Sequence, residues 1–438
     1  MKIKNSLYLA LLLLGFATVQ AQEKKKMSLK DAIELVISNS NEATLANTKV
    51  ATSKLELETM KNNQYPSVKI SGQYSRLTSA NVNSNIGSSN SSSAPLEVSQ
   101  LLLGQANVSM PIFSGFKLQN SIAASESLYK AQTFSASHTK EELAQEVVEL
   151  FADLYKSQEM VKLFEENLKS AQQRSKDFTA MVDNGLLARN DLLKSQLQES
   201  NIQLSLDNAN KNVSVVNYQL VTLLKLKENT IIAIDIETVK SDMAKNQLLT
   251  VEAKRNDLEA LNFQEKASES GIKIAKSGYY PSLALIGGYI ALDLKNVISV
   301  TNAMNFGIGV NYDLASIFKN GKEVKLAKSR TEQTKQAIAI LSDKIKEETH
   351  LAQENYNLSL KQNKVYTLAV EQSDENYRIV KDKYDNSLSN TNDLLEADVQ
   401  QLQSKINLAL SQADIALKYY QLQFASGKLI NSFNLSSK

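Results

Sequence analysis

Cysteine and tryptophan are absent from the 438-residue chain, which also contains only 4 prolines and 14 glycines. Without cysteine there can be no disulfide scaffold, no thiolate metal site, no cysteine nucleophile and no lipid-modified N-terminal cysteine. So few turn-forming residues in a chain of this length favour long helices over compact layered domains. Neither sign of charge predominates, since 49 Lys and Arg residues face 47 Asp and Glu residues, and nothing here indicates a nucleic-acid partner.

The first residues have the pattern of a secretory signal peptide. Lys2 and Lys4 precede an apolar run from Leu7 to Ala17, and the small residue Ala21 follows shortly afterwards. The run is shorter than the roughly 20 apolar residues that a membrane-spanning helix needs. We therefore predict a signal peptide over 1–21, an exported chain, and no transmembrane helix elsewhere.

Two pairs of similar segments indicate an internal duplication. The segment "NQYPSVKISGQYSR" (63–76) is similar to "GYYPSLALIGGYIA" (278–291), and "DNGLLARNDLLKSQLQ" (183–198) is similar to "DNSLSNTNDLLEADVQ" (385–400). The offset is 215 for the first pair and 202 for the second, and a longer Ser- and Asn-rich loop in the first copy, at 78–100, accounts for the difference. The sequence thus predicts a first repeat over 22–240 and a second over 241–438.

Apolar residues recur at alternating steps of four and three, which is the period of a coiled coil. The first repeat predicts a long helix over 116–183 and shorter ones at about 29–62 and 191–226. The second predicts a long helix over 320–386 and shorter ones at 250–277 and 391–427. A helix over 116–183 would be about 100 Å long, which suits a structure that bridges a compartment. The apolar positions include Leu143, Val147, Leu154, Phe164, Phe178, Ile202, Leu206, Leu395, Val399 and Ile406.

Between these helices the period changes to two, which indicates β-strands at about 66–77, 101–112, 281–292 and 303–313. Met304, Phe306 and Ile308 would point to one face, and Asn305 and Gly307 to the other. This length and pattern are typical of transmembrane β-strands, although a water-facing sheet of a soluble protein is the alternative. Four strands cannot close a barrel alone, and two copies would give a barrel too narrow for a channel. We therefore predict a trimer with a twelve-stranded barrel.

The corners between the helices carry a family resemblance. The segment "YDNSLSNTNDLLEA" (384–397) resembles the Tyr-x-x-Gly-x-x-x-x-x-Asp-x-Leu-Asp-Ala signature of the TolC-like outer-membrane efflux and secretion channels, and "NGLLARNDLLKSQ" (184–196) is similar to its partner in the first repeat. The resemblance implies a homotrimer whose β-barrel is continuous with an α-helical coiled-coil tunnel in the periplasm, closed at these corners. It also implies three kinds of partner: a periplasmic adaptor, an inner-membrane transporter of the RND or ABC type, and outer-membrane lipid.

The same resemblance assigns residues to the closed entrance of the tunnel. Asp393 and Glu396 match the two acidic positions of the family's constriction. Tyr384 matches an aromatic residue that helps to hold it shut, and Asp191 is the partner in the first repeat.

Two turns would contact the adaptor, namely Gly185-Leu186 and Ser387-Leu388. The chain departs from the family pattern at Ser387, where the signature has glycine. It departs again at Ser389, where an arginine often ties the closed mouth together.

The residues themselves give the acidic pair a second interpretation. Asp393 and Glu396 are three residues apart and would share a helix face, so threefold symmetry would build rings of carboxylates that attract cations. Alternatively, these acids only complement the dipole of a helix start, with Asn190 and Asn392 as N-caps.

The fold class that we expect is mostly α-helical with membrane β-structure. The expected function is an outer-membrane exit channel of a tripartite efflux or type I secretion system, which conducts substrates passively. The alternative is a periplasm-spanning structural or adhesion protein without an open pore. An enzyme is not expected, since no catalytic constellation or cofactor motif is present. His138 and His350 have no second ligand at metal-binding spacing, so we expect both to be solvated helix residues. The sequence does not distinguish drugs, metals and proteins as the exported substrate.

Overall fold

The computed structural model describes residues 24–82, 96–234, 239, 255–295 and 298–435. The chain divides into two units, which are described separately. The expected signal peptide at 1–21 lies outside the described residues, as do the middle of the 78–100 loop and the start of the helix expected at 250. No helix in the described part of the chain combines the length and hydropathy of a membrane-spanning helix.

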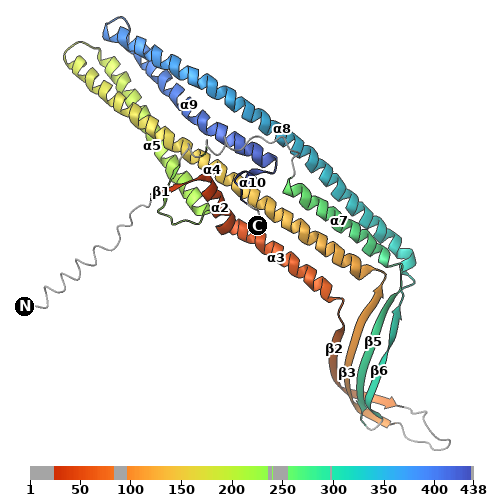
Figure 1. Ribbon diagram of the computed structural model, residues 1–438. Helices are drawn as coiled ribbons and strands as arrows, with labels where there is room; N and C mark the ends of the chain where they lie inside the picture. Colours follow the sequence, from red (N-terminus) through yellow and green to blue (C-terminus); the bar gives the residue numbers. More distant parts are fainter. Residues whose placement is uncertain (1–23, 83–95, 235–238, 240–254, 296–297, 436–438) are drawn as a thin grey trace, which may run out of the picture. The chain divides into compact units, whose positions relative to one another are not determined.

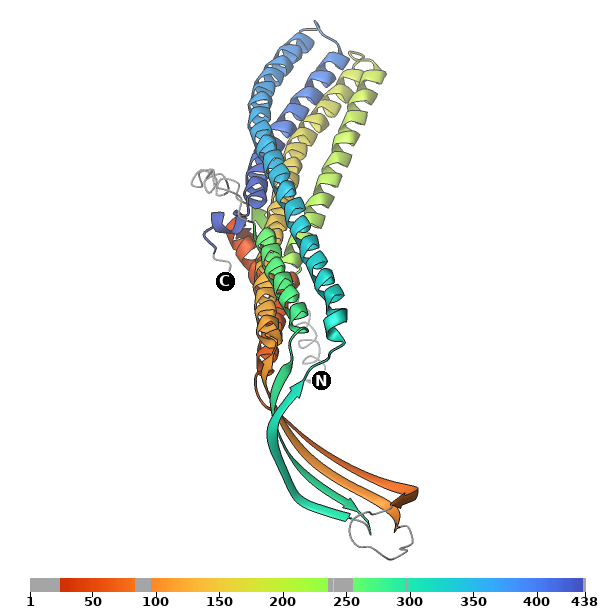
Figure 2. The ribbon, with the colours of Figure 1, turned by 90° about the vertical axis from the view of Figure 1, so that its right-hand side faces the viewer.

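One unit comprises Lys49–Phe134 and Glu259–Ile340 and contains an antiparallel sheet of four strands. The strands are β2 (Ser67–Val82), β3 (Leu96–Ser114), β5 (Ser282–Leu294) and β6 (Ile298–Asn311), and they lie in the order β2-β3-β5-β6 (Figure 2). Within the described residues, neither β2 nor β6 pairs with a further strand at its outer edge.

All four strands run beyond their predicted ends toward the hairpin turns. In the first hairpin, Ala80 pairs with Val98 after an irregularity that follows Arg76. In the second, Leu294 pairs with Ile298 after a register shift that follows Ile290. The prediction placed 78–82 and 96–100 in a loop because a backbone ladder can continue where apolar alternation has ended.

Helices extend from one end of the sheet in this unit. They are most of α3 (Asn41–Asn62), the first parts of α4 (Lys117–Asp183) and α8 (Ser316–Asp385), and α7 (Asn256–Ser277). Phe134 of α4 stacks on Phe263 of α7 with ring centroids 5.4 Å apart, and the Asn320 amide of α8 donates a 2.7 Å hydrogen bond to the Ala275 carbonyl. These contacts hold α7 between α4 and α8.

The other unit comprises Met1–Thr48, Ser135–Leu258 and Leu341–Lys438, and it contains the remaining parts of α4 and α8. These pack with α5 (Arg189–Leu223) and α9 (Thr391–Ala425) (Figure 1). Apolar residues of the predicted coiled-coil period meet in a cluster that includes Phe164, Leu168, Ile202, Leu206 and Ile406. The apolar residues of the 3.5-residue repeat therefore form the face along which these helices pack.

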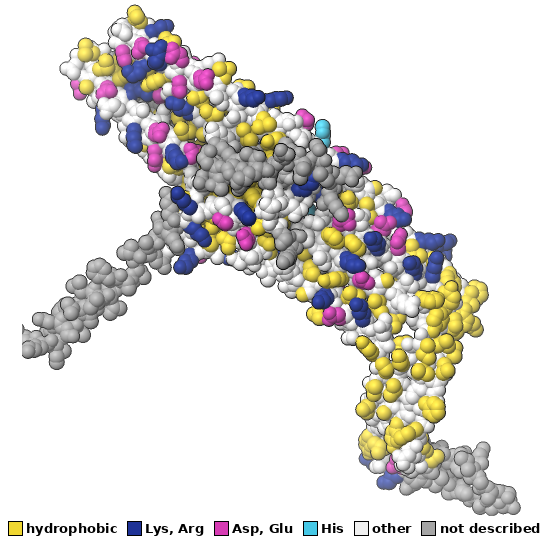
Figure 3. Space-filling model, in the orientation of Figure 1, with side chains coloured by type: hydrophobic (Ala, Val, Ile, Leu, Met, Phe, Trp, Pro, Cys, Tyr) yellow, Lys and Arg dark blue, Asp and Glu magenta, His cyan; other side chains and the backbone are white. Residues whose placement is uncertain are grey.

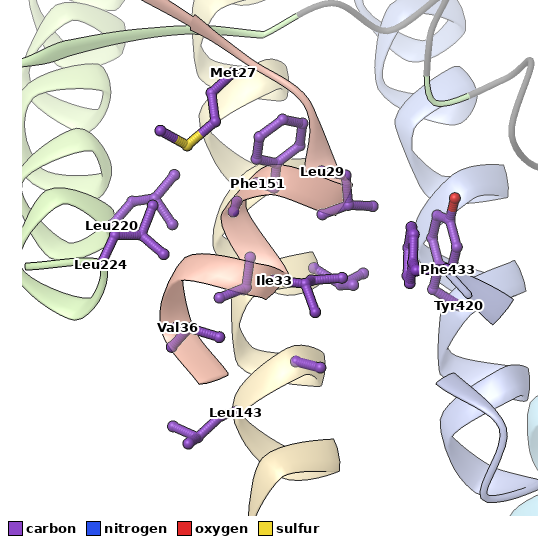
Figure 4. Packing of buried hydrophobic residues seen from close by; sticks show 14 of the residues in the cluster. Met27, Leu29, Ile33, Val36, Leu143, Phe151, Leu220, Leu224, Tyr420 and Phe433 are labelled. Atoms are coloured by element: carbon purple, nitrogen blue, oxygen red, sulfur yellow. The ribbon is translucent and has the colours of Figure 1, made fainter. Parts of the chain in front are cut away.

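The main core of this unit lies around α2 (Leu29–Asn39) (Figure 4). Ile33 and Val36 are fully buried against Leu143 and Phe151 of α4 and Leu220 of α5. A two-stranded parallel pair, β1 (Lys24–Met27) with β4 (Ile231–Ile234), and the short helix α10 (Leu429–Ser432) complete it. The strand β1 was not predicted, because four residues carry too little pattern.

The single helix expected at 29–62 is interrupted at Ser40, which separates α2 from α3. Ser40 has extended backbone angles and is fully buried, and its hydroxyl accepts a 3.1 Å hydrogen bond from the Ala43 N–H. One residue therefore ends the first helix and caps the next, which a hydroxyl can do without any break in the apolar pattern.

Candidate functional site

Two tight corners join the helices at one end of the unit that contains α5 and α9. One lies between α4 and α5, and the other lies between α8 and α9. Each contains an equivalent backbone hydrogen bond. In the first, the Leu186 N–H donates to the Met181 carbonyl at 2.8 Å, and in the second the Leu388 N–H donates to the Lys383 carbonyl at 2.7 Å. A left-handed residue makes each turn possible, namely Gly185 with φ +73° and Ser387 with φ +62°. Although Ser387 stands where the family signature has glycine, its backbone is left-handed too.

Asp393 is part of the helix cap of α9. Its backbone N–H donates to the Asn390 side chain at 3.1 Å, and its carboxylate accepts from the Ser389 hydroxyl at 2.8 Å and from the Asn390 N–H at 3.4 Å. These hydrogen bonds, that of Ser389 foremost, hold the pKa of Asp393 below its usual range. Glu396 is exposed one turn later.

The N-caps differ from the predicted ones. Asn390 caps α9 in place of Asn392, and Ala188, which has no side-chain cap, precedes α5 in place of Asn190. The capping box explains the first difference, because the Asp393 carboxylate can reach only the N–H three residues before it.

The two corners of one chain line a common hollow of about 450 Å3. It brings together Asp191, Leu186, Tyr384 and Ser387, whereas Gly185, Leu388, Asp393 and Glu396 do not line it. The Tyr384 ring lies 6.0 Å from the ring of buried Phe178. Lys194 approaches Asp191 at 3.6 Å and donates to Asn392 at 2.9 Å, so α5 and α9 are joined beside the two corners. Leu186 and Leu388 are largely exposed, at 74% and 78%.

A buried ion pair lies just behind the corners and was not predicted. Arg174 of α4 contacts the Asp398 carboxylate of α9 at 3.0 Å, and Gln198 of α5 donates to the same oxygen at 3.0 Å. Asp398 is only 3% exposed, while the neighbouring Val399, predicted for the apolar seam, is 52% exposed. The buried face of α9 is therefore shifted by one residue from the predicted position. Asp398 can be buried there because Arg174 and Gln198 supply the partners that a buried carboxylate needs. Helical spacing of Arg, Gln and Asp across three separate helices leaves no signal in one sequence.

One face of the four-stranded sheet is apolar and exposed. Pairing across the strands places Val68, Val108, Gly287 and Phe306 in one row on this face. Phe306 is 97% exposed, and Figure 3 shows few charged side chains over the strands. Other exposed members of this face are Ile70, Tyr74, Met110, Leu285, Met304, Ile308 and Val310.

The opposite face is built mainly from small and polar residues, although Ile286 also lies on it. A side chain at Gly288 would collide with Asn305, whose oxygen would lie 2.8 Å from the added Cβ, while Gly307 has open space beside it. Such an arrangement, apolar outside and small or polar inside, is that of a strand between lipid and water.

The two histidines differ from each other. The His138 side chain is 21% exposed, lies 3.5 Å from the Glu142 carboxylate and 3.8 Å from that of Asp257, and stacks on Phe424. The prediction of a solvated residue is therefore wrong for His138, whereas His350 is exposed. In the described part of the chain, no group of three His, Asp or Glu side chains is placed to hold a metal ion.

Comparison with known families gives one match that covers most of the chain. The model of the family described as outer membrane efflux protein matches residues 36–224 and 249–428. No protein with a curated function is similar enough to count as a relative.

Solved structures share the fold at low sequence identity. The Campylobacter jejuni CmeC outer membrane channel has a TM-score of 0.77 at 17% identity, over 95% of this chain and 91% of that one. The Vibrio cholerae outer membrane protein VceC has a TM-score of 0.76 at 13% identity, over 94% and 97%. The Neisseria gonorrhoeae MtrE outer membrane channel, in its open state, has a TM-score of 0.71 at 15% identity, over 94% and 93%.

Proposed function

Because the chain belongs to the outer membrane efflux protein family, we propose that it forms the exit channel of a tripartite efflux or type I secretion system. The protein is an outer-membrane transport channel with a large periplasmic part. We further propose how the channel assembles, which partners it has and where its entrance lies. Substrate would pass through a water-filled lumen, and the energy would come from a transporter in the inner membrane.

The four-stranded sheet is the main reason to propose a trimer. Its apolar face is exposed, and its two outer strands, β2 and β6, lack partners in the described residues. In lipid, an unpaired strand edge leaves backbone groups without hydrogen bonds, so the edges must close on further copies of the chain. Three copies of a four-stranded sheet would give a twelve-stranded barrel wide enough to conduct.

The helices support a periplasmic tunnel below that barrel. Each half of the chain has the order helix, two strands, long helix, helix, as an internal duplication would produce. Three chains would then supply six corners to one mouth. The exposed turns Gly185-Leu186 and Ser387-Leu388 offer apolar tips for a periplasmic adaptor. A structural protein without a pore is less consistent with the sheet, because residues as small as Gly307 cannot plug a barrel.

We place the cation-selective entrance at Asp393 and Glu396. Both side chains are exposed, and threefold symmetry would repeat each as a ring. The low pKa of Asp393 keeps its carboxylate charged near neutral pH.

The test is single-channel conductance of the Asp393→Asn/Glu396→Gln variant in planar bilayers. Asn can still accept the capping hydrogen bonds of Asp393, so the helix start should persist. We expect a higher conductance or a weaker block by divalent cations. The matched control is Glu165→Gln/Glu166→Gln, which removes two exposed charges from the middle of α4. Unchanged currents in the first variant would contradict the acidic rings, while a wild-type protein that forms no channel would contradict the proposed function itself.

A further inference from the structure

A groove of about 870 Å3 lies in the unit that contains the sheet, between α4, α7 and α8. Its size lies within the range of about 300–1,000 Å3 that is usual for small-molecule sites. Its lining contains no residue of the two corners or of the apolar face of the sheet.

The groove opens on the polar side of the sheet. Ser114 and Ser282 line it and pair with each other across β3 and β5. Ser282 also pairs with Asn311, which alternates along β6 with the residues of the apolar face. In the proposed channel the apolar face meets lipid, so the groove would face the lumen.

The floor of the groove is open because α7 presents small residues there. Ala267, Gly271 and Ala275 of α7 line it, as does Gly278, which directly follows the helix. A Cβ atom added to Gly271 would meet no other atom within 4 Å, so no close packing requires glycine at this position. Glycine is unfavourable inside a helix, and its effect here is to leave space.

The walls combine apolar and cationic side chains. Leu128 of α4 and Leu326 of α8 both line the groove and are 47% and 46% exposed, so their apolar surface is available to a bound molecule. Lys117 and Arg330 are also in the lining, and Glu323 is its only acidic member. Among the described residues, none of these three charged side chains forms an ion pair, so the lining has one cation in excess.

From this geometry we propose that the groove is a transit site for small amphipathic anions, with an aromatic or alicyclic body and one carboxylate or sulfonate. The ring system packs between Leu128 and Leu326 over the open floor at Gly271. The anionic group lies within reach of Lys117 or Arg330, where a charge-assisted hydrogen bond is stronger than a neutral one. This inference rests on the proposed function, because it requires that the groove face a conducting lumen.

The experiment measures block of single-channel current by naphthalene-2-sulfonate and by a naphthyl trimethylammonium cation of similar size. Both ions are applied to the Asp393→Asn/Glu396→Gln channel, which lacks the acidic rings that would attract the cation, and there we expect block by the sulfonate and not by the cation. Lys117→Gln/Arg330→Gln should raise the half-blocking concentration of the sulfonate about tenfold, as expected for the loss of charged contacts. Gly271→Leu should raise it comparably by filling the floor, with the assembled protein measured to show that it folds.

The control is Lys325→Gln/Lys328→Gln, which removes two exposed lysines of α8 outside the lining and should leave the block unchanged. Equal block by both ions, or full block in both groove variants, would overturn the transit site while the channel still conducts. A wild-type protein that forms no conducting pore would overturn the channel and the transit site together.

Discussion

Ser387 and Gly185 occupy the same position in two equivalent turns, but the conformational free energy of that position differs between them. Both have left-handed backbones, and for a residue with a Cβ atom that conformation is disfavoured by roughly 1–2 kcal/mol. Nothing lies within 4 Å of a Cβ added to Gly185, so only the backbone distinguishes the two sites.

Ser387→Gly should therefore raise the free energy of unfolding by up to about 1 kcal/mol, since glycine removes the strain but makes the unfolded chain more flexible. Gly185→Ala is the matched opposite change and should lower it by about 1 kcal/mol. Chemical unfolding in detergent, followed by circular dichroism, measures both. A destabilised Ser387→Gly protein would show that the serine side chain contributes more than its backbone costs.

Glu141 is a second residue whose environment is costly. It is 5% exposed, and its carboxylate accepts a 3.1 Å hydrogen bond from the Ile430 N–H at the start of α10. Burial raises the pKa of Glu141 to about 7, although the hydrogen bonds from the α10 backbone act in the opposite direction. Because the folded protein holds this proton more tightly than the unfolded chain, its contribution to stability is largest below about pH 4.5 and declines as the pH rises to about 7.

Glu141→Gln cannot ionise and should remove this decline. Between pH 5 and pH 8, the wild type should lose stability relative to the variant by an amount of order 2–3 kcal/mol. Glu146 also has a raised pKa, caused by burial and by the nearby Glu42 and Glu149, so the difference between the two proteins isolates Glu141. Parallel pH profiles would mean that water reaches the Glu141 carboxylate.

At the scale of elements, the sheet separates two environments by one residue. Phe306 and Asn305 are neighbours in β6, yet they point to opposite faces. Phe306→Lys should cost about 2–4 kcal/mol if its face meets lipid at mid-depth, whereas Asn305→Lys on the polar face should be tolerated. The measurement is the amount of folded protein in isolated outer membranes. Equal loss in both variants would contradict the assignment of the faces.

The long helices could be predicted from the sequence because their 3.5-residue period persists over many turns. Their observed ends lie within a few residues of the expected ones, as with α4 at Lys117–Asp183. The interruption at Ser40 could not be predicted, since one serine fits a helical pattern as well as it fits a cap. The Arg174–Asp398 pair was also missed, because it joins residues on different helices. The corner residues came from the family resemblance, and the hollow that gathers Asp191 and Tyr384 required the structure.

At the scale of the whole molecule, a conducting channel requires that the sheet close into a barrel. One chain leaves the outer edges of β2 and β6 without partners in the described residues and exposes an apolar face. The open edges are not compatible with a lone chain in a membrane, because their backbone groups would lack hydrogen bonds, and the apolar face is not compatible with a lone chain in water. The acidic rings, the lumenal groove and the tunnel mouth all require that the same three copies assemble around one axis.

Native mass spectrometry of the protein extracted in detergent from outer membranes tests this closure directly. We predict a single species of about three times the mature chain mass, which corresponds to a twelve-stranded barrel. A monomer recovered from the soluble periplasmic fraction would contradict it, and the four strands would then be a water-facing sheet.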